Sequence, residues 1–389
     1  MEASANTPEA TRDESERKVT PLELFFDLVF VFGLTQVTLL MSKDPTWSGL
    51  GKGLLVFSAL WWAWAAYAWL TNTFDSDDGI PRIVMFAVMA AFLLAALATP
   101  GAFDDDGVLF GCAYVAARLL HIVLFAITND DVDGLEAIKR LARTAIPAPA
   151  LLIVAGFLDG PEQYIFWVAA LTIDFLGPYV FGVRGFTVSA GHFAERFSLV
   201  LIIALGESIV AVGAGAVDVE LGAGVVTAAV LGIVVSAALW WAYFDVVAIV
   251  AERKFRETTG HERVLIARDS YSYLHLPMIF GIVLVALGVK KTIGHYDDPL
   301  KLVPAAALLG GVALYYLGHV GFRLRNVHSL NKQRLAAALI SVALIPLATE
   351  IPALGALALA AAVTSGLIAY EAIRFAEDRR RVREAAAAH

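Results

Sequence analysis

About twelve apolar runs follow one another along this chain, most of them close to twenty residues long and joined by short polar connections. A helix needs about 20 apolar residues to cross the roughly 30 Å hydrocarbon core of a bilayer. The runs are apolar on all sides, which excludes the amphipathic helices of a soluble bundle. They cover approximately residues 22–41, 50–71, 81–99, 107–127, 145–159, 163–182, 196–215, 222–248, 271–290, 301–322, 333–350 and 353–372.

Composition and loop charge agree with a membrane protein. The chain is 59% hydrophobic and 17% charged, whereas soluble domains are about 45–50% apolar and about 25% charged. With the N-terminus placed in the cytoplasm, basic residues gather in the cytoplasmic connections, and acidic groups such as 104–106 lie on the opposite side, as the positive-inside rule requires. We therefore expect an all-α, polytopic membrane helix bundle of about 12 transmembrane helices, with both termini cytoplasmic. The fifth run holds Pro147 and Pro149 and is expected to be tilted or broken.

The front and back of the chain resemble each other at a shift of about 172 residues. Glu23–Phe25 then overlies Glu195–Phe197, and the polar pair Thr35–Gln36 overlies Glu207–Ser208. Paired tryptophans also recur in the second and eighth runs. This pattern predicts two parallel six-helix repeats, although chance similarity among aromatic-rich membrane helices remains an alternative. The expected parts are a disordered cytoplasmic N-terminus (1–18), a first repeat (19–182), a second repeat (192–372) and a cytoplasmic C-terminal tail (373–389).

A few polar and ionisable residues interrupt the apolar runs. A charged side chain at the centre of a membrane helix is unfavourable by roughly 2.5–3.5 kcal/mol on insertion scales, so such residues usually face the bundle interior or a water-filled path. Asp27 and Thr38 share one face of the first run, and Arg196 and Glu207 share one face of the seventh. The candidates for a polar path are Glu23, Asp27, Thr35, Thr38, Arg118, His121, Asp174, Arg196, Glu207, Ser208 and His275.

Two interpretations of the deep charges stay open. In the functional one, Glu207, Asp174 and His121 form a relay for protons or cations, with Arg118 as the counter-ion of one acid. In the structural one, Arg118 and an acid form a buried clamp that fixes the packing of the helices.

Some of the candidates also have a local alternative. Asp27 follows Pro21 closely enough to act as a cap for backbone groups at the start of its helix. His275 lies near the end of its run and is typical of a histidine that forms a hydrogen bond between helices. His192 and Glu195 are spaced i, i+3, which suits a metal pair, but two ligands alone are a weak signal and a solvated helix start explains them as well.

Several classes of protein are disfavoured. The sequence lacks a phosphate-binding loop, a dinucleotide glycine fingerprint and a His-Glu-x-x-His helix. Its single cysteine, Cys112, excludes an internal disulfide, and its net charge of −8 argues against a nucleic-acid partner. We therefore expect a protein that is not an enzyme, with no catalytic residues, no metal site and no cofactor.

Three segments together resemble the bacterial low temperature requirement protein A (LtrA) family: Pro21–Gln36 (PLELFFDLVFVFGLTQ), His192–Gly213 (HFAERFSLVLIIALGESIVAVG) and Tyr271–Lys290 (YSYLHLPMIFGIVLVALGVK). The resemblance implies a polytopic protein of the bacterial inner membrane, linked by name to growth in the cold, and supplies no substrate. A looser likeness connects Leu24–Phe30 with the Phe-Ser-Asp start of the first helix in potassium channels built from six-helix repeats. The second copy, Arg196–Leu199, keeps Phe-Ser and lacks the acid.

Three functions are compatible with these features. The first is a transporter or channel for a small ion or solute, with a polar path between the two repeats. The second is a membrane-embedded redox or lipid enzyme that would use His192, Glu195, His275 and the tryptophans. The third is a non-catalytic sensor or scaffold that responds to the state of the bilayer in the cold. The lipid bilayer is the expected surrounding in each case, and the oligomeric state stays open.

Overall fold

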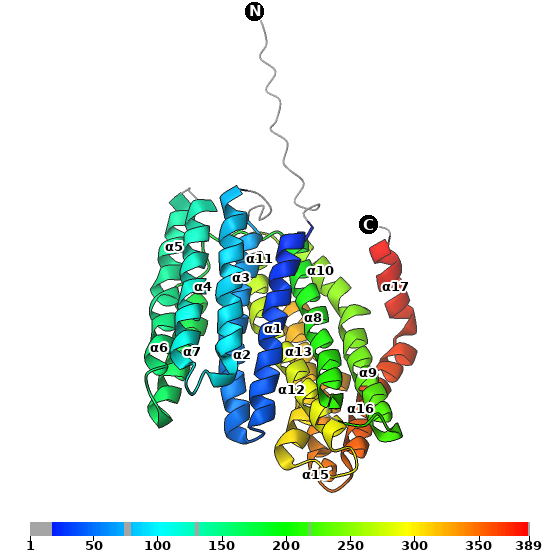
Figure 1. The fold of residues 1–389 in the computed structure, drawn as a ribbon. Coiled ribbons are helices and arrows are strands. Elements are labelled where there is room, and N and C mark those ends of the chain that lie inside the picture. Colours follow the sequence, from blue (N-terminus) through cyan, green and yellow to red (C-terminus); the bar gives the residue numbers. More distant parts are fainter. Residues whose placement is uncertain (1–17, 74–78, 129–131, 218, 388–389) are drawn as a thin grey trace, which may run out of the picture.

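The computed structural model describes residues 18–73, 79–128, 132–217 and 219–387. Within these ranges the chain forms long helices that run roughly side by side (Figure 1). The described residues form no strand beyond an isolated bridge between Pro299 and Pro352. The all-α prediction is therefore confirmed.

The front part of the chain, blue to green in Figure 1, builds one side of the bundle. Its helices are α1 (Pro21–Lys43), α2 (Trp47–Thr71), α3 (Gly79–Ala98), α4 (Gly107–Thr128), α5 (Val132–Ala145), α6 (Pro147–Ala155) and α7 (Gly160–Val180), with a short 3₁₀ turn η1 (Thr99–Gly101) after α3.

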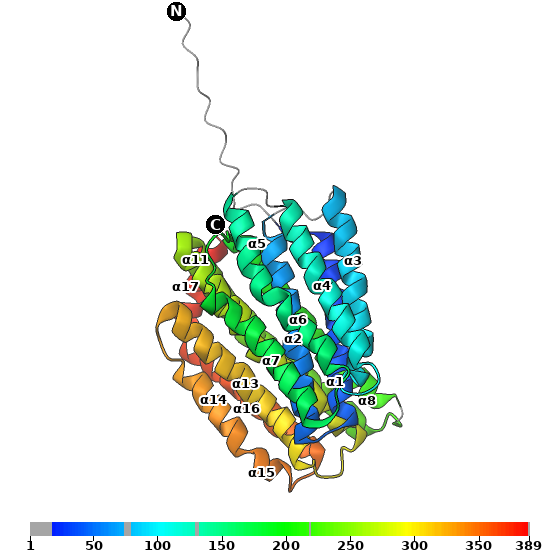
Figure 2. The ribbon, with the colours of Figure 1, turned by 90° about the vertical axis from the view of Figure 1, so that its left-hand side faces the viewer.

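The back part builds the other side. Its helices are α8 (Ala190–Ala216), α9 (Ala223–Phe244), α10 (Val247–Glu257), α11 (Gly260–Ile266), the π-helix η2 (Ala267–Tyr273), α12 (His275–Gly294), α13 (Leu302–Val327), α14 (Lys332–Ala343), α15 (Ile345–Ala348), α16 (Ala353–Arg374) and α17 (Ala376–Ala387). Figure 2 shows α14, α15 and α16 along one edge of the bundle and α3 and α4 along the opposite edge.

Among the described residues, nine helical segments are long and apolar enough to cross a membrane. They contain α1, α2, α3, α4, α8, α9, α12, α13 and α16, some of them extended by the short helices that adjoin them. The prediction of a multi-pass membrane bundle is thus confirmed. The count of about twelve spans and the division into two repeats stay predictions, because three expected spans, at 145–159, 163–182 and 333–350, are not among the nine.

The expected spans at 145–159, 163–182 and 333–350 each lack a long, uninterrupted apolar helix, and the sequence explains why. The break expected near Pro147 separates α5 from α6, because proline has no backbone N–H for the helix ladder. Pro346 stands at the same kind of break between α14 and α15. In α7, Glu162, Gln163 and Asp174 dilute the apolar sequence.

The outer surface of the bundle carries many large apolar side chains, as expected for a lipid-facing surface. On α1, Phe25 and Leu28 are 51% and 57% exposed, whereas their neighbours Phe26 and Asp27 are fully buried. One helix thus turns apolar side chains outward and a carboxylate inward. This is the arrangement that a bilayer requires of a charged residue within a span.

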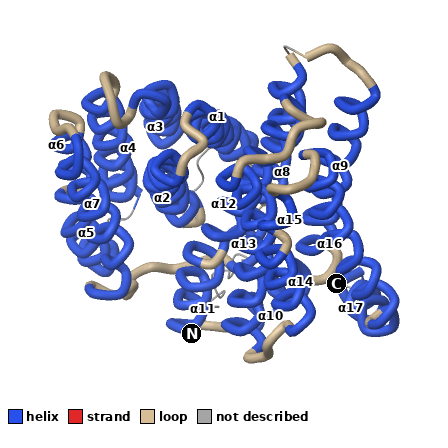
Figure 3. Tube along the Cα trace, turned by 90° about the horizontal axis from the view of Figure 1, so that it is seen from below, coloured by secondary structure: helices blue, strands red, loops and turns tan. Residues whose placement is uncertain are grey.

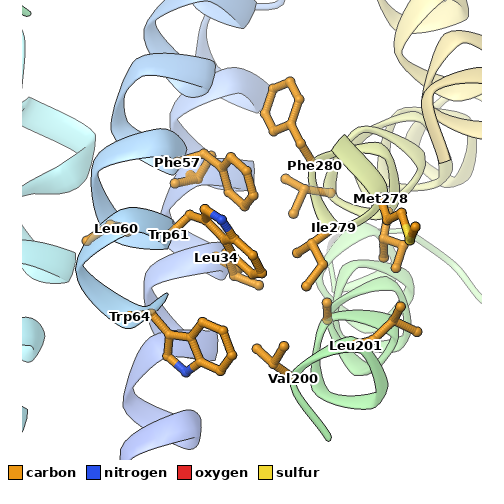
Figure 4. Packing of buried hydrophobic residues seen from close by; sticks show 14 of the residues in the cluster. Leu34, Phe57, Leu60, Trp61, Trp64, Val200, Leu201, Met278, Ile279 and Phe280 are labelled. Atoms are coloured by element: carbon orange, nitrogen blue, oxygen red, sulfur yellow. The ribbon is translucent and has the colours of Figure 1, made fainter. Parts of the chain in front are cut away.

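The buried apolar core extends through both halves and crosses the boundary between them. Trp61 and Trp64 of α2 face Val200 of α8 and Ile279 of α12 across this boundary (Figure 4). Viewed along the helices, α12 lies in the interior and contacts α1, α2, α8 and α13 (Figure 3).

The contact between α12 and α13 is close because glycines face each other there. A Cβ atom added at Gly281 of α12 would lie 2.7 Å from the carbonyl oxygen of Gly311 on α13. Small residues let membrane helices approach in this way, and dispersion contacts then hold them together.

Candidate functional site

A buried network of charged residues joins the start of α1 to the start of α8. We call Glu23, Asp27, His192 and Arg196 the seam network. All four side chains are fully buried. Glu23 and Asp27 are one turn apart on α1, and His192 and Arg196 are one turn apart on α8, so each helix presents one polar stripe to the other.

The start of α1 fixes the position of Glu23. The hydroxyl of Thr20 accepts a hydrogen bond from the backbone N–H of Glu23, and the Glu23 carboxylate accepts one from the backbone N–H of Thr20 at 2.9 Å. This reciprocal capping box satisfies two N–H groups at the start of the helix. The capping role that the sequence allowed for Asp27 is therefore filled by Glu23.

Asp27 binds Arg196 across the boundary between the halves. Nη2 of Arg196 donates to Oδ1 of Asp27 at 2.8 Å, and Nε1 of Trp64 donates to the same oxygen at 2.8 Å. Nη1 of Arg196 lies 3.6 Å from Oε1 of Glu23. The guanidinium also lies over the Trp64 ring, 5.7 Å from its centroid.

The hydrogen bonds around His192 fix its tautomer. Oδ1 of Asn72 accepts from the backbone N–H of Ser189, so the Asn72 amide group points toward Nδ1 of His192, 3.0 Å away. An amide N–H can only donate, so Nδ1 accepts and the ring proton is on Nε2. That proton is donated to Oε2 of Glu23 at 3.0 Å.

The neutral imidazole leaves the seam network with an uneven charge. Glu23 and Asp27 are two carboxylates, and Arg196 is their one guanidinium partner. Oε1 of Glu23 and Oδ2 of Asp27 accept no hydrogen bond from the described residues. The network can therefore take up one further positive charge, a proton or a small cation, at these two oxygens.

A second polar contact lies deeper along the same two helices. The Thr35 hydroxyl of α1 donates to Oε2 of Glu207 on α8 at 2.6 Å. Ser208 is buried beside Glu207, and its hydroxyl forms no hydrogen bond with the described residues. The Thr38 hydroxyl bonds the Leu34 carbonyl of its own helix and also lies close to the Glu207 carboxylate. The α1–α8 boundary thus carries an acid at two depths.

The other predicted pair lies within the front half. Nη2 of Arg118 on α4 donates to Oδ1 of Asp174 on α7 at 2.8 Å, and both side chains are buried. His121 bonds the Ala66 carbonyl. One cavity of about 100 Å³ with largely apolar walls is lined by Arg118, His121 and Asp174. Glu207 does not line this cavity and bonds Thr35 on the α1–α8 boundary. A relay that joins Glu207, Asp174 and His121 therefore stays a prediction.

His275 connects helices of the back half. Its Nδ1 bonds the Ser270 carbonyl at 3.0 Å, and its Nε2 lies 2.9 Å from the Tyr243 hydroxyl. It follows the π-helix η2, a rare element that often occurs at functional sites. The carbonyl of Ser272 in η2 accepts from Nε1 of Trp61 across the boundary between the halves.

Glu195 does not join His192. Glu195 is exposed and accepts a hydrogen bond from the backbone N–H of Val19, while His192 is buried among other partners. Within the part of the chain that the structure describes, no group of three or more His, Cys, Asp or Glu residues is placed to hold a metal ion.

Sequence reasoning missed several partners. Trp64 and Asn72 complete the seam network, and nothing in their local sequence distinguishes them from other residues of an aromatic helix. It also missed a buried cluster in which Arg334 binds Glu371 through two hydrogen bonds of 3.0 Å each and donates to His319 at 2.7 Å.

Comparison with known proteins identifies the family. The model of the bacterial low temperature requirement A protein (LtrA) matches residues 18–369. An uncharacterized protein of Rhizobium meliloti is 28% identical over 307 residues, which is 76% of this chain and 75% of that protein. No solved structure matches the chain significantly. The protein belongs to the bacterial low temperature requirement A (LtrA) family.

Proposed function

We propose that this LtrA-family protein is a transporter or channel that moves a small ion or solute along the seam between its two halves, with a proton or other small cation as the first candidate. The observation that carries the proposal is the charge of the seam network. Among the described residues, two buried carboxylates share one guanidinium beside a neutral histidine, and two of their oxygens accept no hydrogen bond. Ionisable groups buried within spans typically mark ion or substrate pathways.

The second acid on the same seam supports a path rather than a single clamp. The Glu207 carboxylate is bonded by neutral hydroxyl groups, and Lys290 acts on it only from a distance, because no described arginine or lysine forms an ion pair with it. A structural clamp would need a counter-ion at this depth. An acid without one can bind and release a cation on its way along α1 and α8.

The packing of the helices supports two parallel repeats of six spans each. In the front half α1 packs on α2 and α3, α3 on α4, α4 on α6, and α6 on α7. In the back half α8 packs on α9 and α12, α12 on α13, α13 on α14, and α14 on α16. The broken pairs α5–α6 and α14–α15 each form the fifth span of their half. Together with α7, they bring the nine long apolar segments to twelve spans. In this arrangement α1 and α8 are equivalent helices that meet between the repeats.

We also propose a bacterial cytoplasmic membrane location with both ends on the cytoplasmic side. The start of α1 and the end of α17 lie at the same end of the bundle (Figure 1). That end carries the arginines of α5, α10 and α17, as the positive-inside rule expects of the cytoplasmic face.

A flux assay tests the proposal. The full chain is reconstituted into liposomes that contain a pH-sensitive dye, and proton, Na⁺ and K⁺ gradients are imposed in turn. We expect the wild type to dissipate at least one gradient faster than empty liposomes. Glu207→Gln keeps an acceptor for Thr35, so the variant should fold while its flux falls by about ten-fold or more, because the charge that attracts the cation is gone.

The matched control is Glu162→Gln, which removes an exposed carboxylate at the start of α7. Its flux should equal that of the wild type. Wild-type liposomes that dissipate none of the three gradients, or a folded Glu207→Gln variant with wild-type flux, would contradict the proposal.

A further inference from the structure

A cavity of about 510 Å³ lies in the back half, away from the seam network. Its walls come from α9, α10, α13, α14, α16 and α17. This volume falls within the roughly 300–1,000 Å³ of typical small-molecule sites. It also exceeds the cavity beside Arg118 in the front half about five-fold.

Two buried donors point to a ligand that accepts hydrogen bonds. Nη1 of Arg334 can only donate, so Nδ1 of His319 accepts and the His319 ring proton is on Nε2. Asn326 uses Oδ1 to accept from Ser270, which leaves its amide N–H groups. His319 and Asn326 are 2% and 5% exposed and line the cavity, and neither Nε2 nor Nδ2 finds an acceptor among the described residues. An unsatisfied buried donor is unfavourable by about 1–3 kcal/mol.

Two partly exposed acids of the wall are already neutralised. Asp245 accepts from Arg379 at 2.6 Å, and Glu371 is bound by Arg334 through both carboxylate oxygens. Asp378 is the remaining acid of the wall, and it is exposed.

Two cations at the rim remain without a carboxylate. Arg323 and Lys332 line the cavity, are exposed and form no ion pair with the described residues. Together with the buried donors, they give the site a preference for an anion.

Apart from Asn331 and Gln333, the rest of the wall is largely apolar. Its apolar residues include Val246 just before α10, Val247 and Val250 of α10, Ile368 of α16 and Val382 of α17. A free inorganic anion would leave these side chains without a partner, whereas an amphiphile would satisfy both kinds of wall.

We propose that this cavity binds the headgroup of an anionic phospholipid. The phosphate oxygens accept from His319, Asn326 and the rim cations Arg323 and Lys332, and the glycerol and the first acyl carbons lie along the apolar wall. The cavity lies where α9, α13 and α16 end and where α10, α14 and α17 begin. Basic pockets between spans at this depth are suited to anionic headgroups. This site does not depend on the proposed transport.

Native mass spectrometry of the delipidated full chain in detergent tests the site. The probes are dioleoylphosphatidylglycerol, zwitterionic dioleoylphosphatidylcholine and soluble glycerol 3-phosphate. We expect one phosphatidylglycerol to bind in preference to phosphatidylcholine. The double variant Arg323→Gln/Lys332→Gln changes exposed residues only and should weaken phosphatidylglycerol binding by about ten-fold or more.

The control is Arg253→Gln/Lys254→Gln, which removes two exposed cations of α10 that do not line the cavity. It should bind phosphatidylglycerol like the wild type. The lipid assignment is overturned if the rim variant binds as well as the control, or if phosphatidylcholine binds as tightly as phosphatidylglycerol. It is equally overturned if glycerol 3-phosphate alone binds tightly and the rim variant loses that binding, because the ligand is then a soluble phosphate.

Discussion

Removing Arg196 should destabilise the protein far more than removing any exposed arginine. Arg196 lies 2.8 Å from Asp27 and 3.6 Å from Glu23, and all three side chains are fully buried. At these distances each attraction amounts to about 5 kcal/mol with an effective dielectric constant near 20. Part of this is offset because the guanidinium itself no longer has to be desolvated.

The net loss for Arg196→Met is therefore expected to be about 3–5 kcal/mol, the range found when one partner of a buried pair is removed. Most of it reflects the two carboxylates that stay behind without a cation. A second substitution should relieve this. Asp27→Asn removes one of the stranded charges and keeps an oxygen for Trp64, so the double variant should be about 1–3 kcal/mol more stable than the sum of the two single effects predicts.

Reversible unfolding in mixed detergent micelles, followed by the titration of a denaturing detergent, measures these free energies. Arg253→Met serves as the matched control, because Arg253 is 54% exposed and lies 4.0 Å from Glu257. It should change the free energy of unfolding by less than about 1 kcal/mol. A loss below about 1 kcal/mol for Arg196→Met, or strict additivity with Asp27→Asn, would refute the view that the seam network is a coupled and dehydrated unit.

Two further substitutions test other parts of the bundle in the same unfolding assay. Gly281→Ala places a Cβ 2.7 Å from a backbone carbonyl of α13 and should lower the free energy of unfolding by about 1–3 kcal/mol. The control Gly310→Ala meets nothing within 4 Å and should be neutral or stabilising. Equal effects of the two substitutions would contradict the close packing of α12 on α13. Arg118→Met leaves the buried Asp174 without a cation and should lower the free energy of unfolding by about 3–5 kcal/mol. The control Arg184→Met removes an exposed arginine and should have little effect. If Arg118→Met is tolerated, Asp174 is protonated or hydrated.

Much of the architecture follows from the sequence because the bilayer restricts the choices. Long apolar runs predict spans, and proline predicts the break between α5 and α6. Helical periodicity placed Asp27 with Thr38 on α1 and Arg196 with Glu207 on α8, and all four side chains are buried in the structure. The count of spans was harder to read, since α7 and the broken pair α14–α15 lack a long uninterrupted apolar helix.

Partners across the seam could not be predicted in the same way. Periodicity gives the face of a helix on which Asp27 lies, but it does not say which residue stands opposite. Arg196 is 169 positions away, and Trp64 and Asn72 come from a third helix. The same holds for Arg334, Glu371 and His319, which meet only after α13, α14 and α16 have packed. Tertiary arrangement, rather than local sequence, decides such contacts.

The closed seam limits how a cation could pass. Below Arg196, the rings of Trp61, Trp64 and Phe197 contact one another, and the contacts of Arg196 hold α1 and α8 together. If opening breaks contacts worth about 3–5 kcal/mol, the open state is populated to roughly one part in a hundred to one in several thousand. A bound proton or cation that neutralises the surplus carboxylate weakens the attraction to Arg196 and so lowers this barrier. Permeation along the seam would then require charge binding before opening, which favours a gated or coupled carrier over a permanently open pore.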